Sequence, residues 1–296
     1  MVRRYATTDS AISALIADME ASGLYTVKSV AHVREHTALI VPYLDKTLYD
    51  ITPEDVRAIH ARMVDKGLAI STQKSYIQAL RTLLRFVRNP SYDTRIIYQA
   101  DTRPRVDWLT LDEATTALNA PLSAIQHLVI VLGVCMGLRR VEMVRLRMCD
   151  IDVNNQYVNV TGKGRAGGKL RIVPFHARFM PALTGWLKDR AQIIARSRTA
   201  PDNVLIWFDR QHHTAEAYNA VKGSGIDGLV RRASQTVGVH FSAHTLRRTF
   251  GRLLWLAGVP VVTISKIMGH SSTEQTLTYI GANLDDMAQA LDKLII

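Results

Sequence analysis

The feature that most constrains the fold is an apolar run from Ala124 to Val134 that contains almost no polar side chains. Pro121 and Ser123 precede it and are typical of a helix start. A helix that is apolar on nearly every side must be buried on most of them. The longest almost uninterrupted apolar stretch, Leu128 to Leu138, is too short to span a bilayer. Other elements of the same domain must therefore cover this helix.

The first ninety residues predict a domain of helices with short connections. Apolar residues recur at helical spacing in four segments, at about 10–23, 27–41, 52–67 and 71–88. The clearest start is Thr52-Pro53-Glu54-Asp55, which combines a capping residue, a proline at the first helical position and acids in the first turn. Between Asn89 and Asp107 the helical period is lost and two prolines appear, which indicates a linker.

In the second half of the chain, the spacing of apolar residues changes from a helical period to the alternation of strands and back. Thr110 predicts a new helix cap, and the helix after it runs to Ala120. Segments 157–160 and 170–173 alternate like strands and predict a hairpin with a glycine-rich basic tip. Helices resume at about 176–196, residues 204–208 favour a short strand or a buried turn, and the chain reads as helical from about 215. We therefore expect a mainly α fold with a small antiparallel β-sheet, organised as a helical domain (1–89), a linker (90–107) and a second domain (108–296).

The chain carries a large positive charge. Its 37 Lys and Arg against 26 Asp and Glu give a net charge of +11 over 296 residues. Such an excess favours a polyanionic partner, because each phosphate that Lys or Arg neutralises releases condensed counterions. The basic helix at 71–88 could instead have an ordinary solvated face. The side chains that we expect to contact DNA are Lys74, Arg81, Arg85, Arg231, Arg232 and Arg248.

A charged pair follows the apolar helix. Arg139 lies just beyond its end, where a guanidinium is costly unless it is paired or faces a polar cleft. Glu142, three residues later, has the spacing needed to orient Arg139 on a helical turn. The pair could be purely structural, or the arginine could belong to a functional site.

The last part of the chain concentrates reactive side chains. His244 and Arg247 are three residues apart on a helix that Ser242 can cap, within an arginine-rich stretch. Gly269 ends a short helix before His270, and Tyr279 follows nine residues after that histidine. The combination suits covalent chemistry on a phosphodiester, because donor groups can hold the phosphate while a phenol attacks it.

The hairpin tip does not match a nucleotide-binding loop. In a phosphate-binding loop ending at Gly168-Lys169, position 163 would need glycine but is Lys163, and Leu170 stands where serine or threonine is needed. We also find no Cys/His spacing of a zinc site. We therefore expect no nucleotide cofactor and no metal ion.

Taken together, these segments resemble the tyrosine recombinases, the phage integrase superfamily. Gly137-Leu138-Arg139 with Glu142 is similar to the family's first arginine box, and His244-Thr245-Leu246-Arg247 to its second. Lys163 lies in a hairpin like the family's lysine turn, although Lys169 in the same turn is an alternative. Departures at Val141, Arg248 and Met268 remove no catalytic group. The full set in this chain is Arg139, Lys163, His244, Arg247, His270 and Tyr279.

The resemblance implies a site-specific DNA recombinase, an integrase, that works through a 3′-phosphotyrosyl intermediate without metal or ATP. Tyr279 would be the nucleophile and His244 its base, with His270 orienting the phosphate or the base. Lys163 would protonate the leaving oxygen. The two arginines, Arg139 and Arg247, would bind the phosphate oxygens, and Glu142 would hold Arg139 or a neighbouring histidine.

The resemblance also implies an architecture and partners. The N-terminal helices look like the family's core-binding, SAM-like domain, which forms a clamp on DNA with the catalytic domain. A homotetramer on two double-stranded DNA sites is implied, with accessory proteins in some systems, no membrane partner and a cytoplasmic, nucleoid-associated location. The amphipathic segment 284–295 would dock on a neighbouring subunit or pack on its own domain. Two alternatives stay open: a type IB topoisomerase, and a DNA-binding protein that kept this fold without catalysis.

Overall fold

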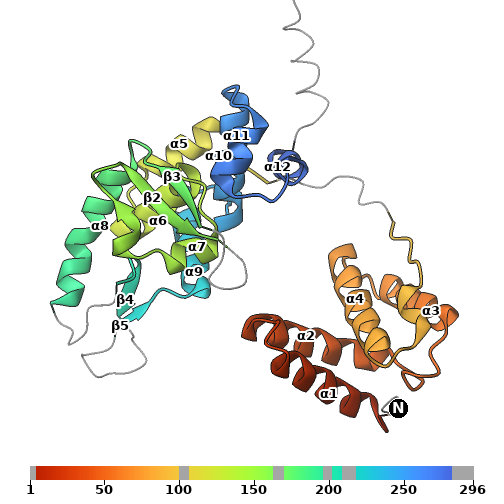
Figure 1. Cartoon of the computed structure of the whole chain (residues 1–296). Helices are drawn as coiled ribbons and strands as arrows, with labels where there is room; N and C mark the ends of the chain where they lie inside the picture. The colour runs from red at the N-terminus through yellow and green to blue at the C-terminus, as the bar shows by residue number, and fades with distance from the viewer. Residues whose placement is uncertain (1–4, 100–106, 163–169, 196–201, 209–217, 282–296) are drawn as a thin grey trace, which may run out of the picture. The chain divides into compact units, whose positions relative to one another are not determined.

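The computed structural model describes residues 5–99, 107–162, 170–195, 202–208 and 218–281. The chain divides into two compact units, residues 1–104 and 105–296 (Figure 1). The first unit is helical, and the second combines helices with short strands. Across the described ranges, no helix is both long and apolar enough to cross a membrane.

The first unit contains the four helices that the sequence predicts. They are α1 (Thr8–Ala21), α2 (Val27–Ile40), α3 (Pro53–Asp65) and α4 (Ile70–Phe86), with short 3-10 helices η1 (Val41–Tyr43) and η2 (Pro90–Asp93). The Thr52 side chain caps α3 by accepting a hydrogen bond from the Asp55 N–H, and Pro53 occupies the first position, as predicted. The helix α1 begins two residues earlier than expected, because Thr7 and Ser10 form a capping box.

The ordered chain of the first unit continues beyond residue 89. The Asn89 side chain is buried, and its amide donates hydrogen bonds to the carbonyls of Leu48 at 2.8 Å and Ile51 at 2.9 Å. The bonds satisfy an amide that would be costly to bury without partners. Because Asn89 directly precedes η2, they also fix that short helix against the unit. At the other end of the expected linker, the Asp107 carboxylate accepts a hydrogen bond from Thr245 in the second unit at 2.8 Å. Both ends of the segment 90–107 therefore belong to the folded units.

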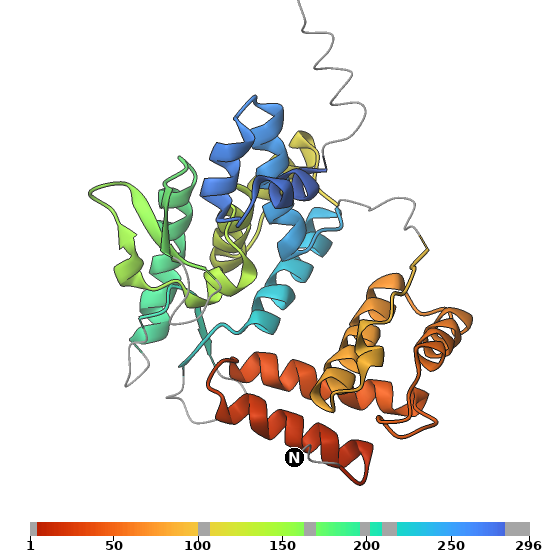
Figure 2. The ribbon, with the colours of Figure 1, turned by 45° about the vertical axis from the view of Figure 1, so that its right-hand side comes forward.

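The second unit is built around the predicted apolar helix. Its helices are α5 (Leu111–Asn119), α6 (Ala124–Val134), α7 (Arg140–Arg145), α8 (Phe179–Ile194), α9 (Gly223–Val237), α10 (Ala243–Leu256), α11 (Val261–Met268) and α12 (Thr273–Ile280), with the 3-10 helix η3 (Met148–Asp150). Residues Leu128 to Leu132 of α6 have no exposed surface. Helices α8, α9 and α10 pack around α6 (Figure 2), which confirms that it is the buried centre of the unit.

Two small antiparallel sheets complete the second unit. The first has the order β1 (Ile151–Asp152), β2 (Tyr157–Thr161) and β3 (Leu170–Pro174), and the pairing of Val158 with Val173 confirms the predicted hairpin. The second pairs β4 (Ile206–Phe208) with β5 (Tyr218–Ala220). The expectation of helix throughout from residue 215 is therefore wrong at 218–220. This short strand forms only because β4 supplies a pairing partner from elsewhere in the chain.

Strand β3 has an unusual orientation. Leu170 and Ile172 are 66% and 57% exposed, whereas the Arg171 side chain between them is only 11% exposed. Successive side chains of a strand point to opposite faces. The strand therefore turns its arginine inward and its two large apolar residues outward.

We expect Gly137→Ala to destabilise the second unit by about 3 kcal/mol. Gly137 has φ +63°, and a methyl group there would overlap the Phe250 ring. Gly238→Ala is the matched control, since Gly238 has φ +75° with no atom within 4 Å of an added Cβ. This variant should lose only about 1–2 kcal/mol of stability, which is the cost of the left-handed backbone conformation for alanine. All four tryptophans lie beyond residue 104, so urea unfolding followed by tryptophan fluorescence reports on this unit. Equal losses in the two variants would contradict the packing argument.

Candidate active site

Five of the six predicted catalytic residues lie in the described part of the second unit and come together there. Arg139 is the N-cap of α7, and His244 and Arg247 lie in the first turns of α10. His270 follows α11 in the turn that begins at Gly269, and Tyr279 lies in α12. Helix α12 packs against both α10 and α11 (Figure 1), and the Arg139 guanidinium donates to the Gly269 carbonyl at 2.9 Å, so residues up to 140 positions apart in the chain share one site.

Glu142 is the centre of the charged part of the site. Its side chain is fully buried, and it accepts hydrogen bonds from the Arg139 guanidinium at 2.8 Å and from the Arg139 backbone N–H at 2.7 Å. It also accepts two hydrogen bonds from Arg171, at 2.8 and 2.9 Å. Arg247 lies 3.7 Å from the same carboxylate. The expected pairing of Glu142 with Arg139 is present, and two further arginines join it.

The arginines set the charge state of this carboxylate. Burial by itself raises the pKa of Glu142, but the hydrogen bonds and charge of Arg171, together with the hydrogen bonds from Arg139, outweigh it and lower that pKa to about 2. Glu142 is therefore ionised at neutral pH. Its contribution to stability is present above the ordinary glutamate pKa of 4.5 and is lost as the pH falls toward 2.

Arg247 is the most deeply buried charge of the site. Only 1% of its side chain is exposed, and it donates hydrogen bonds to the carbonyls of Gly137 and Met268. Burial, reinforced by the charge of Arg139, lowers the pKa of Arg247 to about 10. This value is still well above 7, so the guanidinium keeps its charge. The two carbonyls fix its plane between the end of α6 and the end of α11.

His270 is held in one tautomer. Arginine can only donate, so His270 Nε2 accepts the hydrogen bond from Arg247 at 3.0 Å, and Nδ1–H donates to Thr276 Oγ1 at 2.8 Å. Burial and the neighbouring charges of Arg247, Arg139 and Arg171 lower the pKa of His270 to about 4. The ring is therefore neutral at pH 7, and its two ring nitrogens contact Arg247 and Thr276.

Tyr279 is placed beside both histidines. Its hydroxyl lies 3.0 Å from His244 Nδ1, within hydrogen-bond distance. The rings of His244 and His270 lie 4.9 and 5.1 Å from the Tyr279 ring, centroid to centroid. Burial raises the pKa of Tyr279 despite the nearby positive charges of Arg247 and Arg248. The phenol is thus protonated at neutral pH, with an imidazole nitrogen within hydrogen-bond distance.

The predicted lysine, Lys163, and its alternative, Lys169, lie outside the described residues. The strands that flank them are described, and β3 is tied to the site through Arg171. Besides its bonds to Glu142, Arg171 donates from Nε to the Ile267 carbonyl at 2.7 Å. Strand β3 is therefore anchored to Glu142 and to the end of α11, just before the turn that holds His270.

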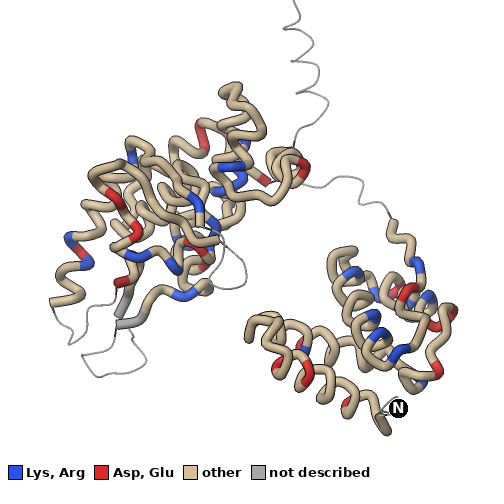
Figure 3. Tube along the Cα trace, viewed as in Figure 1, with Lys and Arg blue, Asp and Glu red and all other residues tan. Residues whose placement is uncertain are grey.

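The residues expected to contact DNA lie on helices of both units. On α4, Lys74 and Arg85 lie over the rings of Tyr98 and Tyr92, at 5.4 and 4.7 Å. Arg81 donates to the Thr94 carbonyl at 2.7 Å. Figure 3 shows the basic positions along α4. In the second unit, Arg231 and Arg232 are exposed on α9, and the Arg248 guanidinium lies 5.4 Å from the Tyr279 ring centroid.

Arg171 is the residue that the sequence analysis missed. Its segment reads as an ordinary alternating strand, in which an arginine between two apolar residues is expected to face solvent. The inward orientation of Arg171 follows only from the pairing of β3 with β2, which places Arg171 opposite the buried Val160. Gly269 makes room for it, since a Cβ at that glycine would lie 2.9 Å from Arg171 Cδ.

Comparison with known proteins identifies the family. Residues 107–285 match the phage integrase family, which is more than half of the chain. The chain therefore belongs to the phage integrase family of tyrosine recombinases.

Named relatives are tyrosine recombinases. The chain is 30% identical over 157 residues to the tyrosine recombinase XerC of Bifidobacterium longum, covering 51% of this chain and 41% of that relative. It is 25% identical to XerC of Oceanobacillus iheyensis, covering 82% of this chain and 81% of the relative. It is 24% identical to the tyrosine recombinase XerA of Thermococcus kodakarensis, covering 90% of each chain.

Solved structures share the fold. The integrase of the Tn1549 transposon, in complex with circular intermediate DNA, matches with a TM-score of 0.70 at 19% identity, over 96% of this chain and 99% of that one. A lambda integrase dimer bound to a core site matches with a TM-score of 0.64 at 19% identity, over 92% and 94% of the two chains. These likenesses support a mainly helical fold with a small antiparallel sheet.

We expect Arg171→Met to destabilise the second unit by about 2–3 kcal/mol, because buried Glu142 loses two charge-assisted hydrogen bonds and keeps only those from Arg139. Arg147→Met is the matched control. Arg147 also pairs with a carboxylate, that of Asp202, but the two side chains are 57% and 49% exposed. Its loss should be below about 1 kcal/mol. Urea unfolding monitored by tryptophan fluorescence measures both variants, and similar small losses would show that Glu142 does not depend on Arg171.

Proposed function

We propose that this protein is a site-specific DNA recombinase that cleaves and rejoins strands through a covalent 3′-phosphate bond to Tyr279. The observation that carries the proposal is the 3.0 Å contact between the Tyr279 hydroxyl and His244 Nδ1, beside the cluster of Arg139 and Arg247. A nucleophile, a base and two guanidinium groups then lie within one site. That is the set of groups that attack on a phosphodiester requires.

The phenol needs a base in order to react. Burial raises the pKa of Tyr279, so almost none of it is phenolate at neutral pH. His244 is within the distance over which a general base can take the proton as the oxygen attacks phosphorus. The new bond joins the Tyr279 oxygen to the 3′-phosphate, and the bond to the 5′-oxygen breaks.

The two arginines stabilise the transition state. Charge develops on the non-bridging oxygens, and a guanidinium presents planar paired donors to such oxygens. The planes of Arg139 and Arg247 are already held by Glu142 and by the carbonyls of Gly269, Gly137 and Met268. Little reorganisation is then needed when the phosphate arrives. His270 contributes by holding Arg247 through Nε2 and could turn that nitrogen toward the phosphate once DNA is bound.

The departing 5′-oxygen needs a proton. We assign that role to Lys163, with Lys169 as the alternative donor on the same hairpin. The anchoring of β3 by Arg171 supports this assignment, because it ties the hairpin to the turn that precedes His270. The phosphotyrosyl bond retains the energy of the phosphodiester, so a 5′-hydroxyl from another strand reverses the step without ATP or metal.

The proposed substrate is double-stranded DNA carrying recombination sites. The net charge of +11 supports a polyanionic partner, and the relatives of known structure include integrases in complex with DNA. We propose that residues 1–89 act as a core-binding, SAM-like domain and that the two units form a clamp on DNA in the cytoplasm, at the nucleoid. The DNA contacts we propose are Lys74, Arg81, Arg85, Arg231, Arg232 and Arg248.

Tyr279→Phe should abolish covalent adduct formation on a nicked suicide substrate, because the ring keeps its packing but loses the attacking oxygen. The adduct is measured by denaturing gel electrophoresis with DNA that carries the chain's own site, mapped from the sequence that flanks its gene. Tyr157→Phe is the matched control and should retain the adduct, because the Tyr157 hydroxyl bonds to Asp152 on the neighbouring strand β1. An adduct at wild-type level with Tyr279→Phe would overturn the assignment of the nucleophile, and no adduct with the wild type would favour a DNA-binding protein without catalysis.

We also propose that recombination requires a homotetramer on two DNA sites and that segment 284–295 docks on a neighbouring subunit. Truncation after Gly281 should weaken assembly on two sites by about tenfold or more and leave single-site binding within about twofold, as expected for the loss of one helix-in-groove contact. Gel mobility shift with one-site and two-site DNA separates these effects. Strand exchange between two sites would also distinguish a recombinase from a type IB topoisomerase. A monomer of the latter would relax supercoiled DNA without any exchange between sites.

A further inference from the structure

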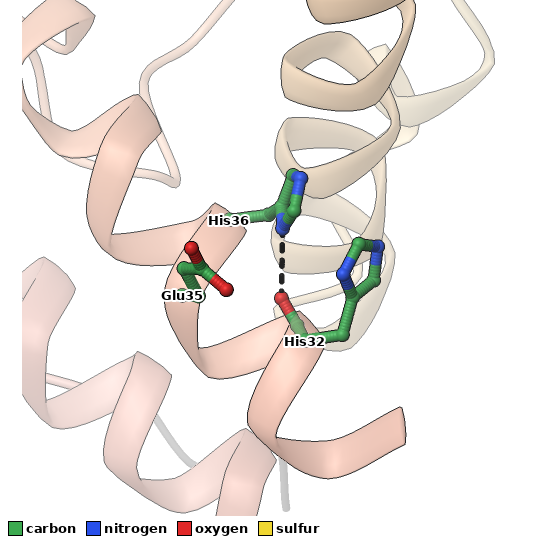
Figure 4. A group of neighbouring side chains, drawn as sticks. All are labelled: His32, Glu35 and His36. Carbon is green, nitrogen blue, oxygen red and sulfur yellow. Dashed lines mark hydrogen bonds between the residues drawn. The ribbon is translucent and has the colours of Figure 1, made fainter. Parts of the chain in front are cut away.

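Helix α2 carries a cluster of potential metal ligands that the proposed reaction does not use. His32 and Glu35 are exposed and His36 is half-buried. One ligand atom of each residue lies within 4.8 Å of those of the other two. Figure 4 shows the two imidazole rings one helical turn apart, with the Glu35 carboxylate beside them.

The spacing suits a metal ion. Histidines at positions i and i+4 share one face of a helix, and zinc enzymes use this arrangement to hold their ion. Two histidines and one glutamate are also a ligand set that leaves one position of a tetrahedral zinc site for water. The ring centroids of His32 and His36 are only 3.9 Å apart, so both can approach the same ion.

A backbone hydrogen bond prepares one of the rings. His36 Nδ1 lies 3.0 Å from the His32 carbonyl oxygen. A carbonyl can only accept, so in the neutral ring Nδ1 carries the proton and Nε2 holds a free lone pair. Histidines that ligate metals usually donate their other ring N–H in this way, which fixes both the tautomer and the ring.

The cluster opens onto a cavity through which an ion and water can enter. A cavity of about 270 Å³ lies between α2 and α4, and both histidines line it together with Ser75, Gln78 and Thr82. Lys74 also lines this cavity, but its ammonium lies 5.4 Å from the Tyr98 ring centroid, which gives it a partner of its own. The Glu35 carboxylate supplies the negative charge that favours a cation at the histidines.

We propose that His32, Glu35 and His36 form a binding site for a divalent transition-metal ion, of which Zn²⁺ is the form to test. Zinc bonds of about 2.1 Å require ligand atoms about 3.4 Å apart. The three side chains must therefore close by roughly 1.5 Å, which rotation of surface side chains supplies. The ion would brace two turns of α2 and add positive charge to the cavity beside α4. The sequence analysis expected no metal, because it sought the cysteine-containing patterns of zinc domains.

The test is isothermal titration of the full-length, tag-free chain with Zn²⁺. His32→Ala and His36→Ala should each weaken the binding of one ion by about tenfold or more, and Glu35→Gln should weaken it less, since each variant removes one ligand. His240→Ala, which removes another exposed histidine, is the matched control and should bind like the wild type. Circular dichroism confirms that each variant remains folded.

A second readout separates this site from any other zinc-binding position on the chain. Co²⁺ in place of Zn²⁺ gives a visible absorption that depends on its ligands, and this absorption should diminish in the two histidine variants and persist in His240→Ala. Wild-type binding by His36→Ala and His32→Ala, or no binding of Zn²⁺ by the wild type, would overturn the proposal. Neither readout requires recombination, so the result does not depend on the proposed function.

Discussion

The buried carboxylate of Glu142 is the interaction on which the rest of the site depends. It has no exposed surface, and the guanidinium groups of Arg139 and Arg171 bind it directly while Arg247 lies 3.7 Å away. One carboxylate cannot neutralise three guanidinium groups, so the cluster carries an excess of positive charge. Such an excess would be unfavourable in a dry protein interior. Two of the three positive charges, those of Arg247 and Arg139, act on the Tyr279 phenol and oppose the rise of its pKa on burial. In our proposal, an incoming phosphate provides the missing negative charge.

The same interaction joins parts of the chain that are far apart in the sequence. Arg139 begins α7, Arg171 comes from β3, and Arg247 comes from α10. Arg139 and Arg171 also bond to the carbonyls of Gly269 and Ile267, and Arg247 to that of Met268, so the turn that holds His270 is fixed by all three. A displacement of any one element therefore reaches both the guanidinium groups of the site and the histidine. Gly137 and Gly269 allow this close approach, because a side chain at either position would overlap Phe250 or Arg171.

Much of this architecture could be predicted from local sequence. The start of α3 follows from Thr52 and Pro53, because capping chemistry acts within one turn. The burial of α6 follows from its composition, and the pairing of Glu142 with Arg139 from their spacing. Strand β5 and the role of Arg171 could not be predicted in this way. Each depends on a partner far away in the sequence: β4 for the strand, and Glu142 for the arginine.

The sequence by itself determined which groups are present and in what order: two arginine boxes, two histidines and a tyrosine, on helices or in the turns that end them. These are properties of short segments, so local rules are sufficient to recognise them. Only the tertiary structure decided the protonation states and tautomers of these groups. The neutral tautomer of His270, the ionised Glu142 and the protonated Tyr279 arise from burial and from neighbours that include Arg171 and Arg247, which are distant in the sequence. Electrostatic environments are set by what lies nearby in space, and that is known only once the chain has folded.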